Sequence, residues 1–117
     1  MRIDLTYMKN MSAGNKELVI EMIDIFKSQV AEFNEEMESL NDGKEYEKLG
    51  KLAHKAKSSI SIMGLHELAA DLKTFENIAK AGTDVETYPM YIAKFREQTA
   101  EAIIELDEVS KNIDLYI

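Results

Sequence analysis

The chain has 117 residues, with 14 Lys and Arg against 22 Asp and Glu, and it contains no Cys, one Pro and five Gly. This length suits one domain that buries its own core, so residues 1–117 are predicted to form a single domain. The absence of Cys excludes disulfides, a thiolate nucleophile and Cys-based metal sites.

The formal net charge of −8 disfavours nucleic acid as a partner, because binding to a phosphate polymer depends on an excess of Lys and Arg. No apolar run approaches the roughly 20 residues of a membrane span, and no signal-peptide stretch follows the first residues. We therefore expect a cytoplasmic protein with no membrane contact.

Apolar residues at helical spacing predict two helices in the first third of the chain. A short helix is expected from Asp4 to Met11, with Leu5, Met8 and Met11 on one side. Asn15 is a candidate cap for a longer second helix. Apolar residues in this second segment recur at steps of three and four, which indicates one buried stripe: Val19, Met22, Phe26, Val30, Phe33, Met37 and Leu40.

Turn signals divide the remainder into three more helices. The turn at 41–43 precedes a third helix from about Lys44 to Met63, which Gly64 ends or kinks. A fourth helix follows and closes at Ala81-Gly82. Pro89 lies near the start of the last and longest helix, whose buried stripe is predicted to be Tyr88, Ile92, Phe95, Thr99, Ala102, Leu106, Val109 and Ile113.

No segment alternates with period two, so the fold class is all-α. Short loops make neighbouring helices run in opposite directions. The expected architecture is an antiparallel up-down-up-down four-helix bundle with a short additional N-terminal helix.

The third helix carries a basic face around a histidine. Five of the twelve Lys lie between Lys44 and Lys57, in a segment with only two Glu. At 100° per residue, His54 points away from the apolar stripe and is expected to be exposed. Neutral imidazole is nucleophilic and can accept a phosphoryl group. Exposed histidines among lysines are also common as ordinary surface, so spacing alone leaves both interpretations open.

The sequence lacks the residue patterns that several other kinds of site require. Neither His54 nor His66 has a Glu three residues before it, so a di-iron bundle site is not expected, and no metal is predicted. No Gly-rich phosphate loop and no Gly-x-Ser-x-Gly turn is present. We expect no cofactor and no independent enzymatic activity, and we expect His66 on the surface at the start of the fourth helix.

The segment 53–64, AHKAKSSISIMG, resembles the signature of histidine-containing phosphotransfer (HPt) domains of multistep phosphorelays. The shared features are Ala-His, a Lys at +3, two small residues and an apolar-Gly pair ending at +10. The resemblance implies that His54 accepts and donates the phosphoryl group, that Lys57 neutralises its oxygens, and that Ser58 leaves room for the partner. With the flanking helices included, it covers nearly the whole chain.

One position departs from the commonest family pattern. Many members have a Gln at +22 from the histidine, where this chain has Glu76, as in the phosphotransfer domains of chemotaxis kinases. A carboxylate that accepts from one ring nitrogen would fix the tautomer of the imidazole and raise the basicity of the other nitrogen. The alternative is that Glu76 is a solvated acid on the surface of its helix. Which of the two roles applies depends on the register of two helices.

The resemblance also implies the partners, which are receiver domains of response regulators and hybrid histidine kinases, with Mg²⁺ bound by the receiver. The chain itself would be a monomeric phosphoryl carrier that does not bind ATP. The surface expected to contact the receiver comprises Gly50, Lys51, Lys55, Ser58, Ser61 and Gly64.

Three alternatives remain from the sequence, and the third of them, a metal-binding bundle, is disfavoured because the chain lacks suitable ligand spacing. The dimeric phosphoacceptor helix of sensor kinases typically has an acidic residue after its histidine and a Pro soon afterwards, whereas Lys55 follows here and the only Pro is Pro89. The second alternative is a non-catalytic interaction module, a pseudo-HPt, that binds a receiver or another partner through the Lys48–Lys57 face.

Overall fold

A computed structural model describes residues 2–117, so Met1, the first residue of the predicted domain, lies outside the described residues. The elements in chain order are α1 (Thr6–Ser12), α2 (Lys16–Asp42), α3 (Tyr46–Ile62), α4 (His66–Ala81), the short 3-10 helix η1 (Val85–Thr87), α5 (Tyr88–Lys111) and α6 (Ile113–Tyr116). Residues 2–117 contain no strand, which confirms the all-α prediction.

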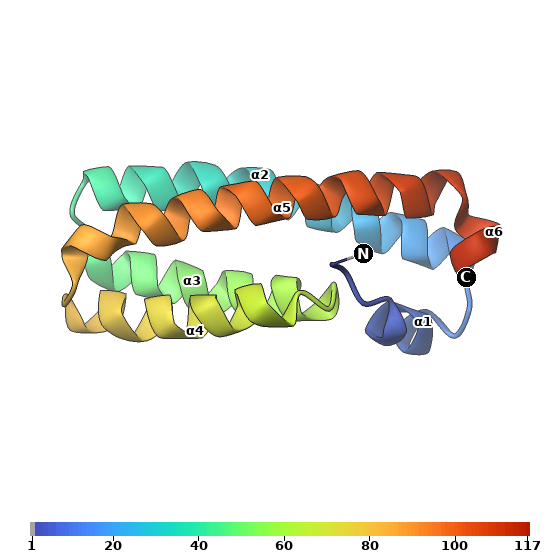
Figure 1. The fold of residues 1–117 in the computed structure, drawn as a ribbon, viewed down its shortest axis with the longest axis horizontal. Helices are drawn as coiled ribbons and strands as arrows, with labels where there is room; N and C mark the ends of the chain where they lie inside the picture. Colours follow the sequence, from blue (N-terminus) through green and yellow to red (C-terminus); the bar gives the residue numbers. More distant parts are fainter. Residues whose placement is uncertain (1) are drawn as a thin grey trace.

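The four long helices form an elongated bundle, and the described chain as a whole extends 46 × 20 × 20 Å along its principal axes. Figure 1 shows that successive long helices run in opposite directions, with α2 and α5 in one layer and α3 and α4 in the other. The most closely packed pair is α3 with α4. The predicted four-helix bundle with an additional N-terminal helix is therefore confirmed.

The helix ends follow from local chemistry. The Asn15 side chain caps α2 by accepting from the Leu18 backbone N–H at 3.1 Å, which satisfies one of the free donors of the first turn. Gly82 ends α4 in the left-handed conformation, with φ of +68°. Pro89 lies in the first turn of α5, where its missing N–H breaks no helical hydrogen bond.

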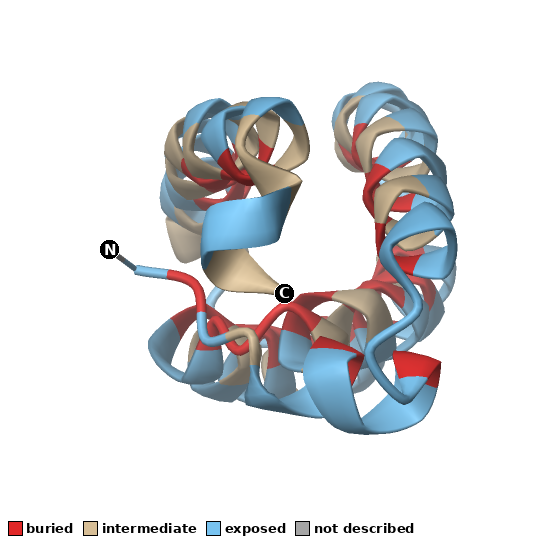
Figure 2. Ribbon diagram, turned by 90° about the vertical axis from the view of Figure 1, so that its right-hand side faces the viewer, coloured by how far each residue is buried: buried red, intermediate tan, exposed pale blue. Residues whose placement is uncertain are grey.

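The core largely matches the predicted stripes, and in Figure 2 buried residues lie on the sides of the helices that face one another. Of the stripe predicted for the last helix, only Ile113 is not buried, and it lies in α6 because α5 ends at Lys111. In α2 the stripe was partly wrong. Met22 and Leu40 are only half-buried and pack against the core, and Ile23 takes the buried position between Val19 and Phe26.

The N-terminal segment closes one end of the bundle. The longer helices α2 and α5 extend beyond α3 and α4, and α1 lies beside that extension (Figure 1). The backbone N–H of Asp4 donates to the Met63 carbonyl at 3.1 Å, so α1 begins after Asp4, at Thr6, and not at Asp4 as predicted. Met8 is buried as expected, whereas Met11 is 60% exposed and does not join the core.

Gly64 allows this segment to approach the loop between α3 and α4. Its φ of +74° is a left-handed conformation, and a Cβ atom at this position would lie 2.3 Å from the Cβ of Asp4 and 2.6 Å from its backbone N and O. Only glycine accommodates both the conformation and the contact. No helix within residues 2–117 is long and apolar enough to cross a membrane.

Candidate functional site

The candidate site lies where the middle of α3 faces the middle of α4. The side chain of His54 on α3 is 59% exposed, whereas that of Glu76 on α4 is only 5% exposed. The Nδ1 atom of His54 is 3.0 Å from Oε2 of Glu76. Glu76 is therefore a buried partner of the imidazole and not a solvated helix acid.

Gly50 explains how α4 comes this close to α3. It lies one turn before His54, and a Cβ atom there would be 2.7 Å from Cγ and 2.9 Å from the backbone N of Lys80, and 3.1 Å from the carbonyl oxygen of Glu76. Because two of these neighbours are backbone atoms, a side chain at position 50 would push α4 away. The glycine thus sets the spacing that brings Glu76 to the imidazole.

Three lysines surround the Glu76 carboxylate. Lys80 Nζ donates to Oε2 at 2.7 Å, and this oxygen is also the one that His54 contacts. Lys57 Nζ and Lys73 Nζ lie 3.6 and 3.9 Å from the other oxygen, Oε1. Oε1 is buried and accepts no hydrogen bond within the described residues.

These contacts fix the charge of Glu76 and the tautomer of His54. The hydrogen bond from Lys80, followed by that from His54, lowers the pKa of Glu76 to about 2, although burial acts in the opposite direction. An ionised carboxylate can only accept, so Nδ1 of the neutral imidazole carries the hydrogen and donates it. The other nitrogen, Nε2, then has a free lone pair on an exposed ring.

The lowered pKa of Glu76 predicts an acid-sensitive contribution to stability. A folded-state pKa below the ordinary value of 4.5 means that ionised Glu76 stabilises the fold above that pH, and that this stability is lost as the pH falls from about 4.5 to about 2. Glu76→Gln removes the titrating group. We expect the difference in the free energy of unfolding between wild type and Glu76→Gln, measured by denaturant titration, to shrink across this window.

Glu97→Gln is the matched control, because Glu97 is an exposed acid of α5. Its stability should follow that of the wild type in parallel over the same pH range. If the Glu76→Gln curve also runs parallel to that of the wild type, the Glu76 carboxylate does not gain stability from its lysine and histidine contacts.

The predicted receiver surface divides into exposed and buried residues. Four of its residues are exposed on α3 with His54: Lys51, Lys55, Ser58 and Ser61. Gly50 and Gly64 are buried, the first against α4 and the second against Asp4. Both glycines were predicted to contact the receiver, but other parts of the same chain cover them.

Sequence reasoning missed Lys73 and Lys80. Both belong to the Glu76 site, and a signal for them existed, since they lie three residues before and four residues after Glu76. Residues at these spacings share one face of a helix. The role of Glu76 depended on an assumed helix register, so this signal pointed to a site only after α3 and α4 were placed.

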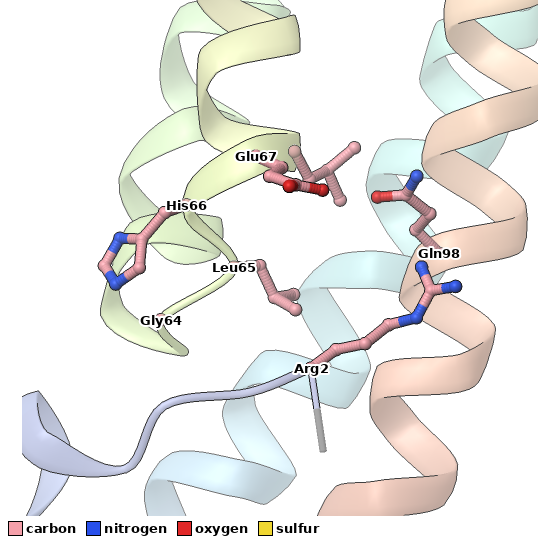
Figure 3. A pocket seen from close by; sticks show the side chains of 7 residues that line it. Arg2, Gly64, Leu65, His66, Glu67 and Gln98 are labelled. Carbon is pink, nitrogen blue, oxygen red and sulfur yellow. The ribbon is translucent and has the colours of Figure 1, made fainter.

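His66 is separate from this site. It begins α4, as expected, with its side chain 75% exposed and Nε2 3.7 Å from Asp4 Oδ2. It borders a surface cavity of about 480 Å³, in which its ring points away from Arg2 and Gln98 (Figure 3). No cluster of three or more metal-ligating side chains occurs in the part of the chain that the structure describes.

Comparison with known families agrees with the geometry. The family model of the Hpt domain matches residues 21–109, which include α3, α4 and most of α2 and α5. The chain belongs to the Hpt domain family. Hpt domains are phosphocarriers of two-component phosphorelays and interact with receiver domains. No curated protein and no solved structure matches the chain.

Proposed function

We propose that this chain is an active phosphotransfer protein in which His54 accepts a phosphoryl group from the aspartate of one receiver domain and passes it to another. The observation that carries the proposal is the contact between Nδ1 of His54 and the ionised Glu76 carboxylate. In the neutral imidazole this contact holds the hydrogen on Nδ1 and leaves the lone pair of Nε2 available for attack, on a side chain that is 59% exposed.

The transfer needs no reactant other than this chain and the receiver domains. The Nε2 lone pair attacks the phosphorus of the receiver's aspartyl phosphate, the P–N bond forms, and the P–O bond breaks with its electron pair returning to the aspartate carboxylate. The reverse step passes the group to the second receiver. Because Glu76 stays ionised, it stabilises the positive charge that develops on the ring. The receiver would hold a Mg²⁺ ion, which would supply positive charge for the phosphoryl oxygens from the partner's side.

Lys57 is proposed to contact the phosphoryl group from this chain. It lies one helical turn after His54, and its Nζ is 3.6 Å from Glu76 Oε1, beyond normal hydrogen-bond distance. The ammonium group therefore lies near the Glu76 carboxylate, the partner of His54, without a short hydrogen bond that would hold it there. In the phosphorylated form it can move to a phosphoryl oxygen.

Replacing Lys57 by Ala should slow transfer and leave the fold intact. Its side chain is about one quarter exposed and lies at the bundle surface, so few core contacts are lost. We expect transfer from a phosphorylated receiver to slow by at least about tenfold, as is typical when one charge-stabilising donor is lost. Rapid-quench measurements would give the rate. Lys9→Ala is the control that should transfer at the wild-type rate, because Lys9 is an exposed residue of α1.

The function itself is tested by incubating the full chain with a receiver domain carrying a labelled aspartyl phosphate. The expected product is an acid-labile, alkali-stable label on the chain, with ring-nitrogen NMR locating the phosphorus on Nε2 of His54. Receiver binding without any label would contradict the proposal and identify the chain as an interaction module that uses the Lys48–Lys57 face. A label on Nδ1 would contradict the assigned tautomer.

A further inference from the structure

The Glu76 carboxylate has more cations around it than its own charge requires. Three lysines, Lys57, Lys73 and Lys80, have Nζ within 4 Å of it, and His54 adds an N–H donor. When the imidazole is neutral, the three ammonium groups and the one carboxylate give this site a net charge of +2. This excess of positive charge beside the exposed imidazole would favour the binding of a second anion, one that is present only part of the time.

The two carboxylate oxygens of Glu76 have different partners. Oε2 accepts short hydrogen bonds from His54 at 3.0 Å and Lys80 at 2.7 Å. Oε1 is buried without a hydrogen-bond donor, and Lys57 and Lys73 approach it only to 3.6 and 3.9 Å. Lys80 is thus bound to the carboxylate, whereas the other two lysines are held nearby by charge.

We propose that Lys73 is a second phosphoryl-binding cation of the site, supplied by α4 opposite Lys57 on α3, and that Lys80 is a positioning residue which holds Glu76 on His54. This assignment rests on the proposed function of His54. In this arrangement both helices contribute to the phosphoryl site. Lys57 from α3 and Lys73 from α4 are each free to leave Oε1 and contact the phosphoryl oxygens.

The packing supports the separate tasks of the two α4 lysines. The Lys73 side chain is 56% exposed, so it is free to reorient toward a group on the exposed imidazole. Lys80 is more constrained, because the close approach at Gly50 places its stem against α3. Lys80 also lies one turn after Glu76, a spacing at which a helix holds an ammonium next to a carboxylate.

The test loads the full chain with phosphoramidate, so that no receiver domain is needed. The P–N bond of phosphoramidate breaks, ammonia leaves, and the phosphoryl group forms a bond with Nε2 of His54. The pH titration of the phosphohistidine is then followed by ³¹P NMR. For Lys73→Gln we expect the titration midpoint of the phosphoryl group to rise by about half a unit or more, because a cation near an anion favours its ionised form.

Lys111→Gln is the charge-matched control, since Lys111 is an exposed residue at the end of α5. It should leave the midpoint at the wild-type value. Lys80→Gln should instead act on the unphosphorylated protein. We expect its ¹⁵N spectrum to show a smaller population of the Nδ1–H tautomer of His54, whereas Lys73→Gln keeps the wild-type population.

The outcomes separate this inference from the proposed function. If wild type is labelled on His54 neither by phosphoramidate nor by the labelled receiver domain, both fail. If wild type loads on Nε2 but the Lys73→Gln midpoint equals that of Lys111→Gln, the proposed function stands and Lys73 is not a phosphoryl ligand. An unchanged tautomer population in Lys80→Gln would remove Lys80 as the positioning residue.

Discussion

Replacing His54 by Gln is expected to abolish the label that a phosphorylated receiver transfers to the chain. The amide nitrogen of Gln has no available lone pair, so the P–N bond cannot form. The change should preserve the fold, because the His54 side chain is mostly exposed and the amide can still donate to the buried Glu76 carboxylate. We expect the acid-labile, alkali-stable label to fall below detection while receiver binding persists.

His66→Gln is the matched control, because His66 is the only other histidine and is also exposed. This variant should be labelled to the same extent and at the same rate as wild type. If label is retained in His54→Gln, or lost in His66→Gln, the acceptor has been assigned to the wrong residue.

The largest loss of stability is expected from Gly64→Ala. The new methyl group would meet the Cβ and backbone of Asp4 at 2.3–2.6 Å, and the alanine would have to adopt a φ of +74°. Left-handed strain of roughly 1–2 kcal/mol adds to an overpacking cost of about 1–3 kcal/mol. The free energy of unfolding, measured by denaturant titration, should therefore fall by about 2–5 kcal/mol.

Gly14→Ala and Gly82→Ala separate these two costs. Both glycines have a positive φ, of +79° and +68°, but a Cβ atom at either position would have no atom within 4 Å. They should lose only the conformational term, roughly 1–2 kcal/mol. An equal loss in all three variants would show that contact with Asp4 contributes nothing.

The chain can also relieve the clash by releasing its N-terminal segment. In that case Gly64→Ala would lose the hydrogen bond from the Asp4 N–H to the Met63 carbonyl. Hydrogen exchange at Asp4 would then be faster than in wild type, while the core amides of α5 would exchange as before. This measurement detects the effect even where the loss of global stability is small.

The sequence predicted the fold well because apolar spacing, caps and turn residues act locally. The last helix shows this, since seven of its eight stripe residues are buried. The errors fall where spacing allows two choices. Met22 and Ile23 both follow Val19 at helical spacing, and only packing against the other helices decides that Ile23 is buried. Met11 was expected on the apolar side of its helix with Met8 but is exposed, and Met8 and Ser12, four residues apart, are the buried residues of α1.

The site could be predicted along one helix but not across two. His54 and Lys57 share a helix, so their relative placement follows from the helical repeat alone. Glu76 is on α4, and its distance from the ring depends on the register and separation of two helices, which Gly50 sets through a backbone contact. That contact is long-range in the sequence. For the same reason, Gly50 looked like open surface when α3 was considered alone.

The location of the site within regular helices also determines how a phosphorylated form can be recognised. His54 and Glu76 both lie several residues from the ends of α3 and α4, the most tightly packed pair in the bundle. Neither residue belongs to a loop that could exchange between two conformations. Many signalling proteins use such an exchange to convert a modification into a change of shape. A partner would therefore distinguish the two forms by the charge at one spot on an otherwise constant surface. The chain would then carry the phosphoryl group without changing its own shape, and any conformational response would belong to the receiver domains.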